Sequence, residues 1–155
     1  MKFKVSLLAT LASVVLAWPS WAADVTYAKD IEPLIKANCA DCHAGDAASL
    51  EQFNQDKEKY KKEKQGPRND TYENLLLILD TGELIRRLDD GTHTDNKKPG
   101  NMNKYLGESP EDRLKALNTI KAWIGEGNWD LSRTVAKDGA PSFSKELLSK
   151  QRLKP

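Results

Sequence analysis

Apolar positions along this chain follow two patterns, one continuous and one periodic. Residues 5–16 are almost wholly apolar, whereas after residue 27 apolar side chains recur every three to four positions without a convincing period of two. A spacing of three to four residues places apolar groups on one face of a helix, while strands alternate. The chain beyond its first segment is therefore predicted to be all-α, with helices joined by polar loops.

The first predicted helix carries both cysteines of the chain on its apolar face. It begins near Asp30, which suits the N-cap position, and Pro33 falls in its first turn, where proline is tolerated. The apolar face consists of Ile31, Leu34, Ile35, Cys39 and Cys42. The two thiols are therefore expected about one helical turn apart on one face.

Three further helices are predicted after residue 69. One strongly apolar helix covers about residues 70–79, and a short one capped by Thr81 runs through Leu88. The last begins at Ser109, which a proline and two acidic residues follow, a typical helix start. Its core-facing stripe consists of Leu114, Leu117, Ile120, Trp123 and Ile124. Between these helices, the polar residues 91–108 are predicted to form a loop.

The apolar stretch at residues 5–16 has the build of a secretory signal peptide. Basic residues precede it and small residues follow it, which predicts cleavage after Ala22, with Ala23 as the alternative. An uncleaved membrane anchor is the competing interpretation, but the stretch is shorter than the ~20 residues that a span needs. We therefore predict a signal peptide at residues 1–22 and an exported mature chain without a membrane span.

Composition and charge exclude some classes of function. Of the 155 residues, 39% are hydrophobic and 30% are charged, which fits one soluble domain with a modest core. Lys and Arg number 24 against 23 Asp and Glu, and loss of the two lysines in the signal peptide leaves the mature chain slightly acidic. Proteins that bind nucleic acid normally have a clear basic excess, so we expect no nucleic-acid partner.

The sequence Cys39-Ala-Asp-Cys42-His43 matches the C-x-x-C-H haem-attachment signature. Two thiols one turn apart can each form a thioether to the same porphyrin, and the adjacent imidazole then reaches the iron as proximal ligand. A thioredoxin-like pair would need a βαβ context, a zinc site with His93 would need separated ligand pairs, and a disulfide would leave His43 unexplained. Because the motif uses both cysteines, we predict one covalently bound haem c.

The distal iron ligand follows by elimination. Met102 is the only methionine beyond the signal peptide, and it lies in the polar loop at residues 98–103, where an apolar side chain needs a reason. The alternatives are a methionine that only fills the core and His93 as the distal ligand, although His93 also suits an exposed loop. Methionine–histidine ligation raises the reduction potential and leaves no open iron position for a substrate.

With these features the chain resembles the class I monohaem c-type cytochromes of bacterial periplasms. The resemblance covers about residues 27–130 and rests on the D-x-x-P-L opening at Asp30, the C-x-x-C-H motif, the late methionine loop and the W-I-x-x-G closing at Trp123. It implies a cytochrome c-like fold whose helices pack around one covalently attached haem, with the first and last helices crossing. No proline follows Met102, which departs from the commoner form of the family's methionine loop.

The resemblance also implies a Gly-Pro pair whose proline carbonyl holds the proximal histidine. Gly66-Pro67 is similar to that pair, displaced by an insertion at about residues 45–64. The predicted organisation is then a signal peptide, a cytochrome c domain at residues 23–130 that contains this insertion, and a C-terminal tail at residues 131–155. One small helix is expected in the tail near residues 144–150.

Four other residues are candidates for contact with the haem. Arg86 or Arg87 is a candidate for pairing with a haem propionate, although an arginine at such a position is more commonly a surface residue. Tyr105 and Trp123 line the haem pocket or simply pack in the core.

A basic cluster in the insertion is either a solvated helix face or a docking patch for an acidic redox partner. Its members are Lys57, Lys59, Lys61, Lys62, Lys64 and Arg68.

The function that these features predict is electron transfer and not enzymatic catalysis. One haem cycles between Fe(III) and Fe(II), and a monomeric chain exchanges electrons with periplasmic redox proteins. One alternative is a dedicated haem subunit of a larger periplasmic oxidoreductase complex. A second alternative is a ligand-binding or peroxidatic haem protein with a weak sixth ligand.

Overall fold

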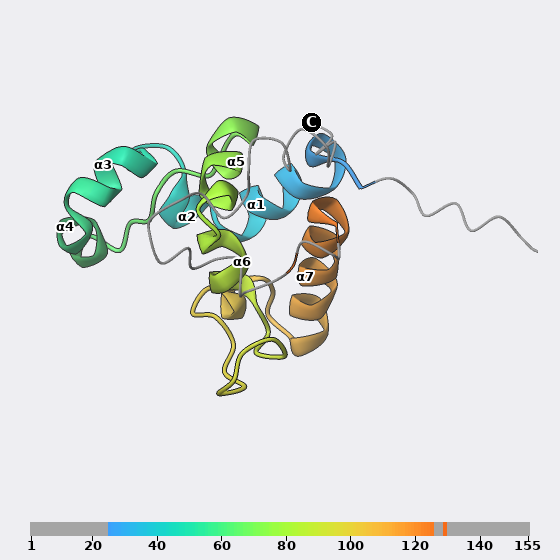
Figure 1. Cartoon of the computed structure of the whole chain (residues 1–155). Coiled ribbons are helices and arrows are strands. Elements are labelled where there is room, and N and C mark those ends of the chain that lie inside the picture. The colour runs from blue at the N-terminus through green and yellow to red at the C-terminus, as the bar shows by residue number, and fades with distance from the viewer. Residues whose placement is uncertain (1–24, 126–128, 130–155) are drawn as a thin grey trace, which may run out of the picture.

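The computed structural model describes residues 25–125 and residue 129. Within these residues the regular structure is entirely helical, without a strand (Figure 1). The all-α class predicted from the spacing of apolar residues is therefore confirmed. The predicted signal peptide at residues 1–22 and the predicted tail at residues 131–155, with its small helix, lie outside the described residues.

Most of the helices are short. In chain order they are η1 (Tyr27–Ile31, one π-helical turn), α1 (Glu32–Asn38), α2 (Ala40–His43), α3 (Leu50–Gln55), α4 (Lys57–Lys62), α5 (Tyr72–Asp80), α6 (Glu83–Leu88), η2 (Asn103–Tyr105, a 3-10 turn) and α7 (Pro110–Ile124). Among the described residues, no helix has the length and apolar character needed to cross a membrane. In Figure 1, α3 and α4 extend to one side of the other helices.

The first helical turn begins earlier than predicted. Thr26 is its N-cap, because Lys29 N donates to Thr26 Oγ1 at 3.3 Å while Thr26 N donates to Asp30 Oδ2 at 2.9 Å. Asp30 therefore lies inside the first helical turn, where its carboxylate accepts from the N-cap backbone, and it does not start the helix. The additional turn buries Tyr27, whose ring centroid lies 6.1 Å from that of Trp123 in α7.

The core lies where η1 and α1 meet α7, and α5 and α6 complete it. The isoleucines and the leucine at this contact are at most 3% exposed; they are Ile31, Ile35, Leu117, Ile120 and Ile124. Each such side chain contributes about 1.5–3 kcal/mol of burial free energy. The rings of Tyr27, Tyr72 and Trp123 pack together beside them. The first and last helical segments thus pack against each other, as the family resemblance implies.

Helix α7 follows its predicted start but not all of its predicted stripe. Ser109 Oγ accepts from Asp112 N at 3.0 Å, and the carboxylate of Asp112 accepts from Ser109 N, so a capping box forms with proline directly inside it. Leu114, however, is 52% exposed, and its prediction as a core residue was wrong. At about 100° per residue, Leu114 falls outside the arc of the helix that holds Leu117, Ile120 and Ile124.

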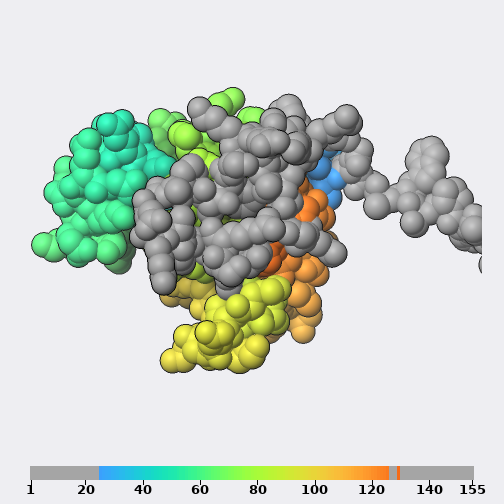
Figure 2. Space-filling view, in the orientation of Figure 1, coloured from blue at the N-terminus to red at the C-terminus, as the bar shows by residue number. Residues whose placement is uncertain are grey.

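The predicted insertion contains the two helices α3 and α4. Ser49 and Gln52 form a capping box at the start of α3, and Asp56 caps α4 through Lys59 N. Only Phe53 of these helices is buried, and its ring stacks on Tyr60 at 6.0 Å. Figure 2 shows α3 and α4 as a protruding lobe, coloured teal. The lobe therefore contributes little to the core and exposes its lysines.

Candidate haem-binding site

The C-x-x-C-H motif sits at the junction of two helices. Cys39 follows α1, with its amide donating to Ile35 O at 2.8 Å, and Cys42 and His43 belong to α2. Cys42 N and His43 N both donate to Cys39 O, at 3.3 and 3.0 Å, so about one helical turn separates the two cysteines. Both thiols are free, and burial raises the pKa of Cys39 to about 11, with Cys42 adding to the rise. The cysteines are thus arranged as two separate thiols on one turn.

The imidazole of His43 has a fixed orientation. Its Nδ1 lies 2.7 Å from the carbonyl oxygen of Pro67. Because a carbonyl only accepts hydrogen bonds, Nδ1 is the donor, and the lone pair of the neutral ring is on Nε2. This is the contact that the resemblance implies for Pro67, across 24 positions of sequence. A carbonyl on the non-ligating nitrogen is the usual way to orient a metal-binding histidine.

Three backbone hydrogen bonds hold the Pro67 segment against the motif and the loop that follows it. Gly66 N donates to Cys42 O at 2.9 Å, Asn69 N donates to His43 O at 3.0 Å, and Arg68 N donates to Ala48 O at 2.8 Å. At Gly66, a β-carbon would overlap the ring of His43, which requires glycine at this position. The chain thus returns to the motif after the α3–α4 lobe.

Arg68 and Asp70 form a clip at the end of this segment. The guanidinium donates from Nε to Oδ1 at 3.1 Å and from its terminal nitrogen to Oδ2 at 2.8 Å, which is a bidentate pair. The hydrogen bond from Arg68 lowers the pKa of Asp70, and a further one from Asn74 adds to this effect. The clip therefore links the segment that orients His43 to the start of α5.

We expect this clip to weaken in acid. The folded pKa of Asp70 lies below its unfolded value of about 3.9, so the folded state binds fewer protons. Its stabilisation is complete above the unfolded pKa and disappears as the pH falls through the folded pKa. The contribution of this ion pair to the free energy of unfolding is small because the pair is partly exposed and screened by water. Urea unfolding at neutral pH should show Asp70→Asn to be less stable than wild type.

The difference between Asp70→Asn and wild type should shrink when the unfolding is repeated near pH 3. Asp95→Asn, which changes an exposed loop carboxylate, is the matched control and should track wild type at both pH values. A deficit in Asp70→Asn that does not depend on pH would contradict the role of the charge.

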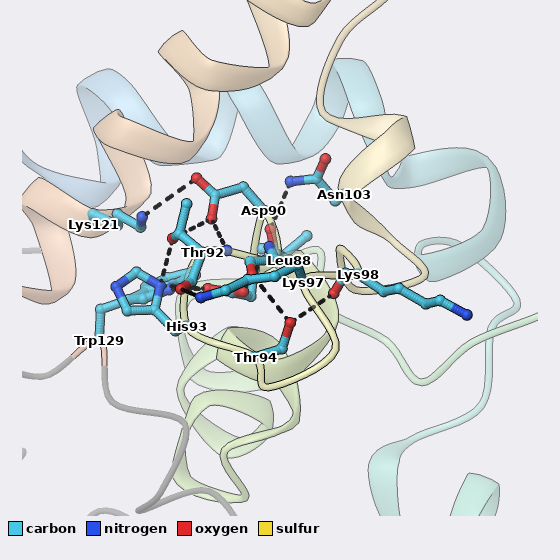
Figure 3. Close-up of polar contacts among 12 residues, drawn as sticks. Leu88, Asp90, Thr92, His93, Thr94, Lys97, Lys98, Asn103, Lys121 and Trp129 are labelled. Atoms are coloured by element: carbon cyan, nitrogen blue, oxygen red, sulfur yellow. Dashed lines mark hydrogen bonds and ion pairs between the residues drawn. The ribbon is translucent and has the colours of Figure 1, made fainter.

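The methionine loop is attached to the C-terminal end of α6. Gly100 N donates to Asp89 O at 2.8 Å, and Met102 N donates to Arg87 O at 3.0 Å. The side chain of Asn103 donates to Leu88 O at 2.8 Å (Figure 3). Met102 is half-buried and packs against the hydrophobic core. The loop is thus hydrogen-bonded to the C-terminal end of α6 through residues on both sides of Met102 and through Met102 itself.

The two arginines of α6 share one carboxylate. Arg86 makes a bidentate pair with Glu83, and Arg87 Nε donates to the same carboxylate at 2.7 Å. Burial alone would raise the pKa of Glu83, but the two guanidiniums outweigh it and the net shift is downward. Arg87 also donates to Asn101 Oδ1 at 3.3 Å, so it contacts the methionine loop. A propionate contact by either arginine stays a prediction.

Tyr105 and Trp123 lie in different surroundings. Tyr105 is 53% exposed, with Lys104 Nζ 4.8 Å from its ring centroid. Trp123 is buried among the core aromatic rings. Trp123 is therefore a core residue and Tyr105 a surface residue, and a haem contact by either stays a prediction.

Sequence reasoning missed the most buried polar group near the methionine loop. Asp89 is fully buried; its Oδ1 accepts from Trp129 Nε1 at 3.0 Å and its Oδ2 accepts from Gly91 N at 2.8 Å. His93 Nδ1, from the alternative distal ligand, lies 2.8 Å from Asp89 Oδ1. The pair Asp89-Asp90 after a short helix looks like any polar helix end, so no local signal identifies it.

Together, the residues around the motif fit a covalently attached haem. Two unpaired thiols lie one turn apart, and the adjacent imidazole has its Nε2 available. Gly66 supplies the space that the ring of His43 occupies. A single turn that carries two thiols and an oriented imidazole matches the chemistry of haem attachment.

Comparisons with known proteins agree with this site. A family model described as PccH cytochrome c matches residues 26–155. Among solved structures, the monohaem cytochrome PccH from Geobacter sulfurreducens is similar, with 41% sequence identity and a TM-score of 0.66. The match covers 81% of this chain and 94% of that chain. A comparison with curated proteins gave no significant match.

Proposed function

Because the chain belongs to the PccH cytochrome c family, we propose that it is an electron carrier whose haem iron is ligated by His43 and Met102. Membership confirms the predicted class of monohaem c-type cytochromes, its fold and a single covalently bound haem c. A haem electron-transfer protein is the function that this family supports. The axial ligands and the partners are the finer points that the proposal adds.

One observation carries the proposal: the hydrogen bond between His43 Nδ1 and Pro67 O, next to the two thiols. It fixes the tautomer and the orientation of the imidazole, so that Nε2 can face an iron held through Cys39 and Cys42. When bound, the haem supplies the Fe(III)/Fe(II) couple. The protein forms and breaks no bonds in this process; it tethers the cofactor and limits the access of water.

Met102 is a better distal ligand than His93 in this structure. The side chain of His93 is 43% exposed, and its Nδ1 is already engaged with Asp89. Met102 packs against the core, and hydrogen bonds to α6 hold the backbone around it. A thioether favours the reduced iron, and with both axial positions filled no substrate can bind.

The cellular setting follows from the sequence. We infer that residues 1–22 direct export and that haem is attached outside the cytoplasm. The chain then acts as a monomer and exchanges electrons with a donor and an acceptor that are periplasmic redox proteins. Within the chain we assign residues 23–130 to the cytochrome c domain, with the lobe of α3 and α4 as its insertion. Residues 131–155 form the tail.

A spectroelectrochemical titration of the exported holoprotein tests the proposed function. We expect a reversible one-electron transition and a reduced form that stays six-coordinate and low-spin under carbon monoxide. Met102→Ala serves as the positive control, because opening the distal position should allow carbon monoxide to bind. A wild-type reduced form that is five-coordinate and binds carbon monoxide readily would contradict electron transfer through a filled iron site.

A further inference from the structure

Asp89 is a buried carboxylate at the C-terminal end of α6. Its side chain is fully buried, and its partners come from separate parts of the chain. Trp129 Nε1 donates to Oδ1 at 3.0 Å, Gly91 N donates to Oδ2 at 2.8 Å, and His93 Nδ1 lies 2.8 Å from Oδ1. A carboxylate can be buried only if hydrogen bonds replace its water, so this set of donors is what allows Asp89 to remain inside.

Other charged groups complete the surroundings of this carboxylate. Asp90 accepts from the backbone and the hydroxyl of Thr92, and its Oδ2 lies 4.0 Å from Lys121 Nζ of α7. That ammonium group also lies 5.3 Å from the ring centroid of Trp129. Figure 3 shows His93, Trp129 and Lys121 gathered beside the loop. Although the ligand atoms of Asp89, Asp90 and His93 lie within 4.8 Å of one another, both oxygens of Asp89 already have N–H partners.

The main chain of the same residue holds the methionine loop. Asp89 O accepts from Gly100 N at 2.8 Å, and two residues earlier Arg87 O accepts from Met102 N at 3.0 Å. At Gly100 a β-carbon would overlap the backbone of Arg87, so the loop approaches α6 as closely as its atoms allow. The side chain of Asp89 therefore holds Trp129, while its carbonyl holds the loop two residues before Met102.

We propose that Asp89 is a positioning residue for Met102, and that the hydrogen bond from Trp129 fixes the conformation of the Asp89 side chain. The hydrogen bond between Trp129 Nε1 and Asp89 Oδ1 joins two positions 40 residues apart and links the segment after α7 to the end of α6. When Trp129 holds the carboxylate, the end of α6 has one conformation, and the loop attached to it presents Met102 in one place. The proposal relies on the proposed function only for the identity of the iron ligand.

The holoprotein with Trp129→Phe tests this directly, because phenylalanine keeps an aromatic ring and removes the Nε1 donor. We expect the amide protons of Gly100 and Met102 to exchange with solvent about tenfold faster than in wild type, since one hydrogen bond to a charged group is lost. We also expect exogenous imidazole to displace the distal ligand with about tenfold higher affinity, and the reduction potential to move in the negative direction.

Thr71→Ala is the matched control. It removes the hydroxyl that accepts from Asn74 N at the start of α5, so it lowers overall stability away from the methionine loop. This variant should leave the imidazole affinity and the exchange of Gly100 and Met102 close to wild type. Asp89→Asn retains one carbonyl acceptor for Trp129 and should fall between wild type and Trp129→Phe.

The positioning role is wrong if Trp129→Phe loses stability like Thr71→Ala but keeps wild-type exchange at Gly100 and Met102. It is also wrong if the imidazole affinity of Trp129→Phe stays within twofold of wild type even though the exchange of Gly100 and Met102 is faster. Failure of the proposed ligation is recognised separately. In that case wild type lacks the far-red absorption band of methionine-ligated ferric haem. The amide exchange of Gly100 and Met102 still tests whether the hydrogen bond between Trp129 and Asp89 holds the loop.

Discussion

Replacing Met102 by alanine is expected to abolish the far-red absorption band of the ferric protein and to lower its reduction potential by on the order of 0.1 V. The thioether sulfur stabilises Fe(II) relative to Fe(III), and alanine has no group that can replace it. Water or an added ligand can then reach the distal position. Optical spectra of the oxidised protein and a spectroelectrochemical titration measure both effects.

His93→Ala is the matched control for this experiment, because His93 is the other candidate for the distal position. Its removal should leave the far-red band in place, since the imidazole is hydrogen-bonded to Asp89 and 43% exposed. A band that survives in Met102→Ala would refute ligation by Met102. A change of axial ligation in His93→Ala, with Met102→Ala unchanged, would identify His93 as the ligand.

Replacing Gly66 by alanine is the second change for which we expect a large effect. The new β-carbon would overlap the ring of His43, so either the imidazole or the Pro67 segment must move. Movement of the segment breaks the hydrogen bond of Gly66 N to Cys42 O and the one between His43 Nδ1 and Pro67 O. We expect a loss of about 3 kcal/mol in the free energy of unfolding and a lower yield of haem-loaded protein.

Gly45→Ala is the appropriate comparison for Gly66→Ala. Gly45 has a φ of +62° and open space around it, so alanine there meets only backbone strain, of about 1 kcal/mol. The haem spectrum of Gly45→Ala should match wild type, whereas that of Gly66→Ala should change because the proximal ligand moves. Equal stability and identical spectra in the two variants would show that the contact between Gly66 and His43 is not tight.

The parts of the structure that could be predicted depend on neighbouring residues. The C-x-x-C-H motif needs only one helical turn, and the start of α7 needs only Ser109, its proline and Asp112. Two predictions were wrong, the core position of Leu114 and the helix start near Asp30, because both depend on residues that are distant in sequence. Leu114 has the spacing of a core residue, but which arc of α7 is buried depends on the helices that pack against it. Thr26 caps the first turn because Tyr27 is buried by residues from α5 and α7.

By itself, the sequence predicted the helical class, haem attachment at Cys39 and Cys42 and the limit of one haem, because each prediction rests on residue types at short spacing. The family resemblance suggested Pro67 as the residue whose carbonyl orients His43, and the tertiary structure decided that it does. What holds the methionine loop came from the tertiary structure alone. Pro67 meets His43 across 24 positions, and Trp129 meets Asp89 across 40. Such contacts form when packed helices bring distant segments together, and no local pattern encodes which buried donor and acceptor will then meet.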